Sequence, residues 1–267
     1  MTVAVIGAGV MGETLLSGLI RAGHDLADLV VGEKRPERAV ELREKYGVTV
    51  VANTEAVERA DTVALVVKPQ DMGEVLTEIA PHLRTGQMVM SLAAGTTTDF
   101  IEKHIPDGVA VVRVMPNTPA LVDEGMAAIS PGTHCDDEHL QEAERLLSSI
   151  GKVLRVPEKQ QDAVTAISGS GPAYLFFVVE AMIEAGVHLG LPRSTCTELV
   201  VQTVVGSAKL LRETGDHPTV LRERVTSPGG TTAAAIRELE DHKVRAAFIT
   251  AMEAARNRSR ALADSDD

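Results

Sequence analysis

The sequence predicts an α/β protein with a parallel sheet covered by helices on both faces in its N-terminal part, followed by an all-α part. Up to residue 156, short β-branched runs alternate with helix-like stretches, which is typical of such a sheet. From residue 163 the strand-like runs stop, and long stretches of helical periodicity replace them. We therefore expect two domains, residues 1–158 and residues 159–267.

The expected strands are short and nearly continuous in apolar character, as strands buried on both faces are. They are Val3–Ile6, Leu29–Val31, Val48–Val51, Thr62–Val67, Met88–Ser91, Val109–Val114, Met126–Ile129 and Lys152–Val156. The helices expected between them are Met11–Ala22, Pro36–Tyr46, Thr54–Arg59, Asp71–Ala80, Thr97–Lys103 and Asp137–Ile150.

Four helices are expected in the second part: Pro172–Leu189, Arg193–Glu213, Thr231–Leu239 and Lys243–Ala263. The first is apolar around most of its circumference, so it must be covered on nearly all sides. A second copy of the chain would cover it, which predicts a homodimer through these helices or a higher assembly of dimers. A central helix in a monomeric bundle is the alternative. The acidic tail, Asp264–Asp267, is expected to fray.

The composition is that of a globular, acidic protein. Of 267 residues, 44% are apolar and 24% are charged, so a sizeable core can form. The net charge of −12 and the 2% aromatic content argue against nucleic acid and against anionic membranes as partners. A salt-adapted source and an ordinary acidic protein both explain this charge.

Cysteine and histidine usage predicts neither a disulfide framework nor a metal site. The two cysteines, Cys135 and Cys196, form no CxxC pair, and the eight histidines lack ligand-like spacing. The N-terminus has no basic start, and the longest uncharged run, residues 163–179, is interrupted by glycine and proline. These features predict a cytoplasmic protein that does not span a membrane.

A glycine-rich loop follows the first strand and opens the first helix. Gly7 permits a tight turn, Gly9 lets the backbone approach a pyrophosphate, and Gly12 lets the helix pack on the strand. The N–H groups of the helix N-terminus then face the phosphates. This loop, with Val10 and Met11, predicts a Rossmann-type dinucleotide site; a purely structural turn is the alternative.

Tips of other strands supply the rest of the expected cofactor site. Glu33 would accept hydrogen bonds from the adenosine ribose and favour NAD. Lys34 and Arg35 would instead clamp a 2′-phosphate and favour NADP, or lie in solvent, so NADH and NADPH both remain open. The later tips, at the edge where open α/β sheets bind ligands, contain Val67, Lys68, Pro69, Ala93, Ala94 and Asn117.

A turn rich in glycine and hydroxyl groups, Ser227–Thr232, precedes a helix in the second part. Such a helix N-terminus can hold a small anion, for example a carboxylate, on free N–H groups. An ordinary N-cap is the alternative. Two glycines flanked by hydroxyls exceed what capping needs, which favours the anion site.

Taken in order, these segments resemble the pyrroline-5-carboxylate reductases, from residue 1 to about residue 262. The matching blocks are GAGVMGETLLSGL, VVKPQ, MSLAAGTTTDFIE, VRVMPNTPALVDEGM, DAVTAISGSGPAYLF, GLPR and VTSPGGTTAAAI. The resemblance implies a Rossmann domain, a helical dimerisation domain with swapped helices, and reduction of 1-pyrroline-5-carboxylate to L-proline by NADPH or NADH, the last step of proline biosynthesis.

The resemblance also assigns residues by their position in these blocks. Ser227, Gly229, Gly230 and Thr231 would hold the substrate carboxylate, and Thr232 would hydrogen-bond near the ring nitrogen as the catalytic candidate. Asn53 would lie near the adenosine ribose, and Lys68 and Pro69 beside the nicotinamide half.

Two alternatives are an imine or β-hydroxyacid dehydrogenase of related architecture and a non-enzymatic dinucleotide-binding regulator. The former usually carries a catalytic lysine on the long interdomain helix, whereas Pro172–Leu189 has none. The acidic charge and the lack of a DNA-reading element argue against the regulator.

Overall fold

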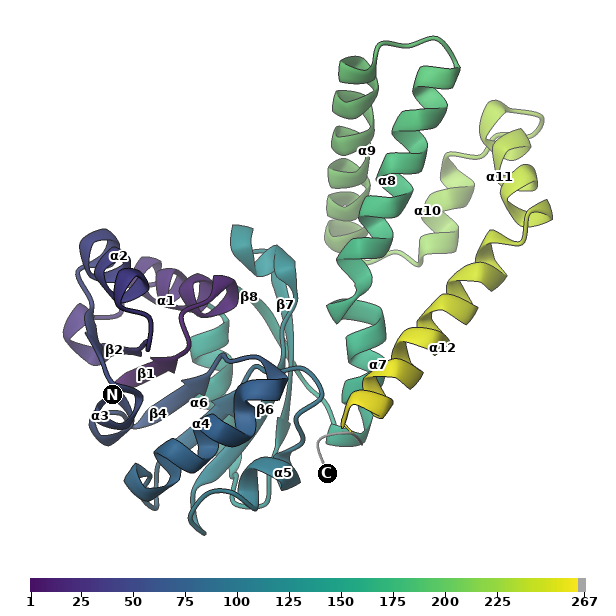
Figure 1. Ribbon diagram of the computed structural model, residues 1–267. Coiled ribbons are helices and arrows are strands. Elements are labelled where there is room, and N and C mark those ends of the chain that lie inside the picture. Colours follow the sequence, from purple (N-terminus) through teal and green to yellow (C-terminus); the bar gives the residue numbers. More distant parts are fainter. Residues whose placement is uncertain (264–267) are drawn as a thin grey trace. The chain divides into compact units, whose positions relative to one another are not determined.

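The structure, a computed structural model, describes residues 1–263, and the expectation for the tail Asp264–Asp267 lies outside them. The chain forms two compact units: Met1–Ser170 together with the segment that begins at Ala254, and Gly171–Glu253. The predicted fold class is confirmed, with a sheet and its covering helices in the first unit and helices in the second (Figure 1). The domain boundary between residues 158 and 159 stays a prediction.

Within the described residues the sheet has eight strands in the order β3-β2-β1-β4-β5-β6-β7-β8. Each expected strand is present, with ends that differ by a few residues at most. The strands are β1 Val3–Ile6, β2 Leu29–Gly32, β3 Thr49–Val51, β4 Thr62–Leu65, β5 Met88–Ser91, β6 Ala110–Met115, β7 Gly125–Pro131 and β8 Gly151–Arg155.

The end of the sheet departs from the parallel arrangement that the sequence predicts. β7 runs antiparallel to β6, and β8 is parallel to β7. Between β6 and β7 the chain has room only for the 3₁₀ helix η4, Thr118–Val122. A parallel neighbour needs a crossover of roughly a dozen residues or more, whereas an antiparallel one accepts a short connection. The length of this link therefore sets the direction of β7.

Helices cover both faces of the sheet, and each face has its own apolar cluster (Figure 1). The helices α1, α2 and α6 pack on one face through side chains such as Leu15, Leu42 and Leu146. The helices α3, α4 and α5 pack on the other face through Val57, Leu76 and Ile101. Their bounds are α1 Val10–Arg21, α2 Pro36–Tyr46, α3 Asn53–Arg59, α4 Met72–Ile79, α5 Thr98–Glu102 and α6 Asp137–Leu147.

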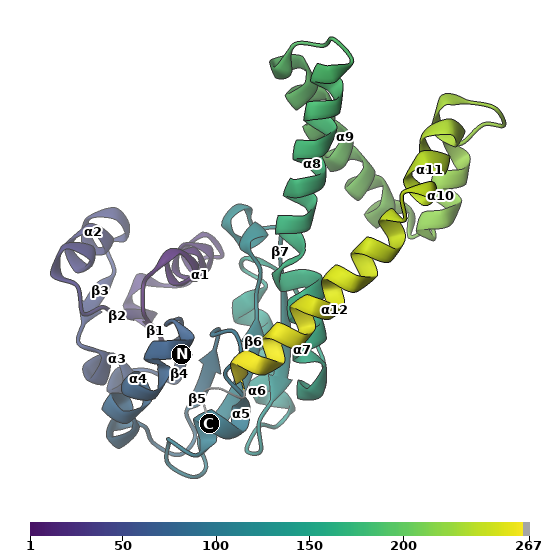
Figure 2. The same cartoon turned by 45° about the vertical axis from the view of Figure 1, so that its right-hand side comes forward.

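A short helix α7, Gln161–Val164, and a π-helical turn, Thr165–Gly169, lead out of the first unit. The helices that follow are α8 Gly171–His188, α9 Arg193–Thr214, α10 Pro218–Arg224, α11 Thr231–Asp241 and α12 Val244–Ala263. The sequence did not predict α10, which is short and is marked only by Pro218 and the capping residue His217. α8 and α9 lie side by side (Figure 2).

α8 buries none of its residues within this chain. Its side chains Phe176 and Phe177 are 68% and 72% exposed, and Leu189 at its end is 81% exposed. Among the described residues, the helical stretch Glu158–His188 is long and apolar enough to cross a membrane by length and composition alone. An apolar helix that packs inside a soluble protein passes the same test. Whether α8 is covered by protein or by lipid therefore distinguishes the two cases.

Candidate functional site

The loop between β1 and α1 depends on glycine for its close packing. Gly7 has φ +89°, and its N–H donates to the Gly32 carbonyl at 3.0 Å. A Cβ on Gly12 would lie 2.1 Å from the Gly7 carbonyl oxygen, which no side chain tolerates. The helix can therefore approach the turn only because both positions lack a side chain.

Gly9 is glycine for a different reason. A Cβ at Gly9 would meet no atom of the chain within 4 Å, so nothing in the protein fills the space in front of it. Gly9 is also the N-cap of α1, and no side chain caps the helix there. Free N–H groups beside an open space at a helix N-terminus fit the pyrophosphate of a dinucleotide.

Glu13, in the first turn of α1, would repel a phosphate if its charge were uncompensated. It accepts hydrogen bonds from Arg38, from Lys45 Nζ at 2.8 Å and from Tyr46 Oη at 2.7 Å. Burial raises the pKa of Glu13, but the hydrogen bonds from Lys45, Arg38 and Tyr46 outweigh it and lower the pKa to about 2. The carboxylate is thus ionised and neutralised by its partners.

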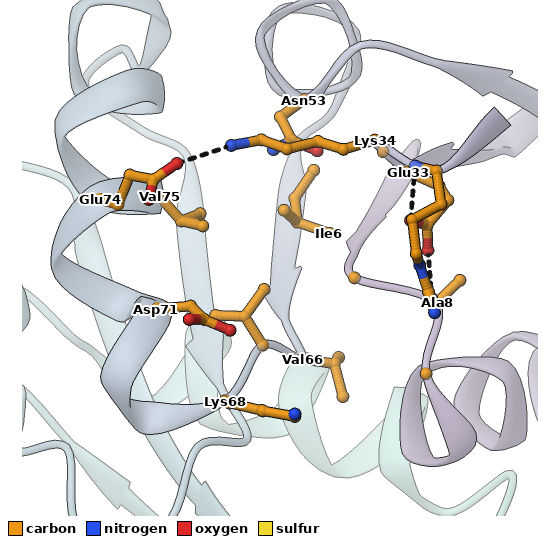
Figure 3. Close-up of a pocket in the computed structure, with 15 residues that line it drawn as sticks. Ile6, Ala8, Glu33, Lys34, Asn53, Val66, Lys68, Asp71, Glu74 and Val75 are labelled. Carbon is orange, nitrogen blue, oxygen red and sulfur yellow. Dashed lines mark hydrogen bonds and ion pairs between the residues drawn. The ribbon is translucent and has the colours of Figure 1, made fainter. Parts of the chain in front are cut away.

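A cavity of about 460 Å³ opens at the carboxyl ends of β1, β2 and β4 (Figure 3). The order of the strands reverses at β1 and β4, the place where open α/β sheets bind ligands. Eight of the predicted cofactor residues line it: Gly7, Gly9, Glu33, Lys34, Arg35, Asn53, Val67 and Lys68. The lining does not include Val10, Met11, Gly12, Pro69, Ala93, Ala94 or Asn117.

Sequence reasoning missed one wall of this cavity. Asp71, Glu74 and Val75, at the start of α4, complete the lining opposite the tip of β2. These residues belong to the first turns of an ordinary amphipathic helix, so no motif marks them. Only the VVKPQ tip just before them could have drawn attention to this segment.

The tip of β2 carries paired charges. Arg35 forms two hydrogen bonds with the Glu33 carboxylate, Nε to Oε1 and Nη2 to Oε2, both at 3.0 Å. The Glu33 side chain is only 6% exposed. Burial raises the pKa of Glu33, but hydrogen bonds from Arg35 and from the Ala8 backbone outweigh it, so the pKa lies below its ordinary value. Glu33 is therefore a buried, ionised carboxylate beside the phosphate loop.

The Lys34 side chain extends away from Glu33 and Arg35, toward α4 (Figure 3). Its Nζ lies 3.1 Å from Glu74 Oε1, a pair that Figure 3 shows, and 3.1 Å from Glu78 Oε2. Asn53 Nδ2 donates to the same Glu78 oxygen at 3.1 Å. Lys34 thus ties the tip of β2 to α4 across the cavity.

Asn117, after β6, uses both ends of its amide within the protein. Its Oδ1 accepts the Met126 N–H at 2.8 Å, and its Nδ2 donates to the Ser168 carbonyl and hydroxyl at 3.3 and 3.2 Å. Asn117 therefore holds the start of β7 and the π-helical turn together.

The Ser227–Thr232 turn lies in the second unit and opens α11. Gly229 has φ +69°, and the Gly230 N–H donates to the Ser227 carbonyl at 3.0 Å. A Cβ on Gly230 would lie 2.4 Å from Ser227 Oγ. Gly230 is the N-cap of α11, and no side chain caps the helix. The first N–H groups of α11 are thus available to an anion, and the ordinary Ser or Thr cap is not formed.

Within residues 1–263, no group of three or more His, Cys, Asp and Glu side chains is arranged to hold a metal ion. Cys135 and Cys196 are both free thiols.

Two family models match the chain. Residues 158–262 match pyrroline-5-carboxylate reductase dimerisation, and residues 2–95 match NADP oxidoreductase, coenzyme F420-dependent. The segment that matches the dimerisation model includes α8 and its exposed apolar side chains.

Relatives match along nearly the whole chain. A pyrroline-5-carboxylate reductase of Corynebacterium melassecola is 48% identical over 98% of both chains. The solved structure of a Coxiella burnetii pyrroline-5-carboxylate reductase has 38% identity and a TM-score of 0.94, again over 98% of both chains. The Plasmodium falciparum pyrroline carboxylate reductase, solved with NADP bound, has 29% identity and a TM-score of 0.88 over 98% of both.

Proposed function

This chain belongs to the pyrroline-5-carboxylate reductase family, and we propose that its Gly7–Gly12 loop binds a dinucleotide pyrophosphate while its Ser227–Thr232 turn binds the substrate carboxylate. The chain is an NAD(P)H-dependent oxidoreductase that reduces 1-pyrroline-5-carboxylate to L-proline. Family membership decides against the β-hydroxyacid dehydrogenase and the regulator.

The observation that carries the residue assignment is the α11 N-terminus. It has a glycine N-cap, no capping side chain, and the Ser227 hydroxyl packed against Gly230. A carboxylate placed there would accept from the helix N–H groups and gain from the helix dipole. The open space at Gly9 supports the pyrophosphate assignment in the same way.

The residues that line the cavity fit a nicotinamide dinucleotide, which when bound supplies the hydride. Glu33 and Asn53 would lie by the adenosine ribose, Gly7 and Gly9 by the phosphates, and Val67 and Lys68 toward the nicotinamide half. Val10, Met11, Gly12, Pro69, Ala93, Ala94 and Asn117 stay predicted members of the site.

A cyclic imine needs little further help from the protein. A protonated C=N bond accepts a hydride at carbon without forming an alkoxide, so no strong general acid is required. Holding two reactants in register can remove roughly 7–11 kcal/mol of the barrier. In this mechanism Thr232 orients the ring nitrogen by a hydrogen bond, and the Ser227–Thr231 turn fixes the carboxylate.

We also propose that the active form is a cytoplasmic homodimer, or an assembly of such dimers, joined through the C-terminal helices. The exposed Phe176 and Phe177 of α8 support this arrangement. Light scattering tests it, and a stable monomer near 28 kDa would overturn it.

The experiment that tests the site assignment follows the oxidation of NADH or NADPH when substrate is added. Wild type should turn over 1-pyrroline-5-carboxylate, and L-proline should compete with it for the carboxylate site. If proline does not compete while the imine is reduced, the Ser227–Thr232 assignment is wrong even though the activity is present.

A further inference from the structure

The side chains at the tip of β2 bear on whether the enzyme prefers NADH or NADPH, which differ by one phosphate group. Glu33 directly follows β2, about 20 residues beyond Gly12, where an acidic side chain accepts hydrogen bonds from the adenosine ribose hydroxyls. It lines the cavity, and its side chain is 6% exposed. A phosphate on the ribose 2′-oxygen would replace a hydrogen-bond donor with an anion at this carboxylate.

The arginine that could bind such a phosphate is already engaged. Arg35 holds both oxygens of Glu33, at 3.0 Å each, and its backbone N–H donates to Glu33 Oε1 at 3.0 Å. To reach a 2′-phosphate, the Arg35 guanidinium would have to leave Glu33. That would strand a nearly buried carboxylate without its partner and beside a second anion, which is strongly unfavourable.

The lysine is engaged as well. Lys34 Nζ lies between Glu74 and Glu78, at 3.1 Å from each. Counted together, the tip and its partners hold three carboxylates (Glu33, Glu74 and Glu78) against two cations. The local charge is therefore negative before any cofactor arrives, which disfavours a further phosphate.

The next cations along α2 do not change this balance. Arg38 is bound by Glu13 and Glu41 and also donates to the Ala8 carbonyl. Arg43 donates to the Val50 carbonyl. Neither side chain lines the cavity, and each guanidinium already donates to a backbone carbonyl elsewhere.

We infer that Glu33, held by Arg35, makes this enzyme prefer NADH to NADPH by roughly tenfold or more, because like charges brought together in a site are strongly unfavourable. The inference rests on the proposed role of the cavity as the dinucleotide site. It concerns preference, so the NADP bound to the Plasmodium falciparum relative, at 29% identity, is compatible with it.

The test separates binding at the adenosine end from catalysis. Calorimetric titration of the full-length enzyme with ADP-ribose and with 2′-phospho-ADP-ribose compares the two cofactors without the nicotinamide. Wild type should bind ADP-ribose more tightly than 2′-phospho-ADP-ribose, by about tenfold or more. The ratio of kcat/KM for NADH and NADPH should follow the same order.

Glu33→Gln keeps the shape of the side chain, removes its charge and frees Arg35. This variant should bind 2′-phospho-ADP-ribose about tenfold more tightly than wild type does, with ADP-ribose affinity unchanged or lower. Glu37→Gln is the matched control, since it removes the same charge from an exposed position on α2 outside the cavity lining. Its preference should equal that of wild type.

The outcomes distinguish an error in the NADH preference from an error in the assignment of the cavity. If wild type binds the phosphorylated probe as well as or better than ADP-ribose, the NADH preference is wrong while the cavity assignment stands. The role of Glu33 is also wrong if Glu33→Gln and Glu37→Gln shift the preference equally. If neither probe binds, the cavity is not the dinucleotide site, and the proposed function fails together with this inference.

Discussion

In the N-terminal unit the apolar side chains of both sheet faces are buried by helices of the same chain, whereas in the helical unit most of them are exposed. Leu15, Leu76 and Ile101 are fully buried in the first unit. Among the described residues of Gly171–Glu253, the buried apolar side chains are Cys196 and Val200. The core of the N-terminal unit is therefore complete within one chain, whereas the helical unit leaves apolar side chains exposed that the proposed second copy would cover.

The largest expected effect comes from preventing association with that second copy. Replacing Phe176 and Phe177 of α8 by Asp places charges on a face that association would bury, so we expect a monomer near 28 kDa and a loss of activity of roughly a hundredfold or more. Light scattering and steady-state kinetics measure both. Titration with ADP-ribose should still give the wild-type affinity, because the cavity belongs to the other unit.

Val122→Asp is the control for this experiment. Val122 is 71% exposed in the first unit, so it undergoes the same apolar-to-acidic change at a similar exposure. Its assembly state should match that of wild type. A fully active monomer of the α8 variant would contradict the idea that the helical unit depends on a partner.

The second effect separates a glycine that leaves room for the ligand from a glycine that lets the helix pack on the turn. Gly9→Ala adds a methyl group that meets no atom of the protein, so the melting temperature should stay unchanged while dinucleotide affinity falls roughly tenfold to a hundredfold. Gly12→Ala drives its Cβ toward the Gly7 carbonyl oxygen and should lower the melting temperature by several degrees. Calorimetry and cofactor titration separate the two variants. Equal melting temperatures would contradict this division of roles.

The third effect tests the helical unit by changing the substrate instead of the protein. 1-Pyrroline lacks the carboxyl group, so it cannot accept hydrogen bonds from the α11 N-terminus. We expect its kcat/KM to be about a hundredfold lower than that of 1-pyrroline-5-carboxylate, since charge-assisted hydrogen bonds are lost. Comparable turnover of the two imines would remove the carboxylate role from the Ser227–Thr232 turn.

The sequence predicted what depends on short-range patterning. Strands such as Val3–Ile6 and Met88–Ser91 appear at the residues expected, because a short, mostly apolar run between two helix-like stretches is typical of a strand buried on both faces. The reversal of β7 escaped prediction, since an apolar strand reads the same in either direction. α10 escaped because seven residues give too little helical periodicity.

The site was predicted in the same uneven way. The glycine spacing from Gly7 to Gly12 marks the phosphate loop by local geometry alone. The pairing of Lys34 with Glu74 and Glu78 was invisible, because α4 lies about 40 positions further along the chain and carries no motif. Sequence reasoning therefore left the charges of the β2 tip unbalanced, and the fold supplies their partners.

The smallest effect concerns the one side chain assigned to the ring nitrogen. Thr232 lies in the first turn of α11, next to the carboxylate site. Because hydride transfer to an iminium needs alignment more than acid catalysis, Thr232→Ala should lower kcat by about tenfold without abolishing it. Thr232→Ser retains the hydroxyl and should recover most of that rate. Stopped-flow rates of NADH oxidation under saturating substrate measure the step, and complete inactivity of the alanine variant would make Thr232 an obligatory proton donor and this mechanism wrong.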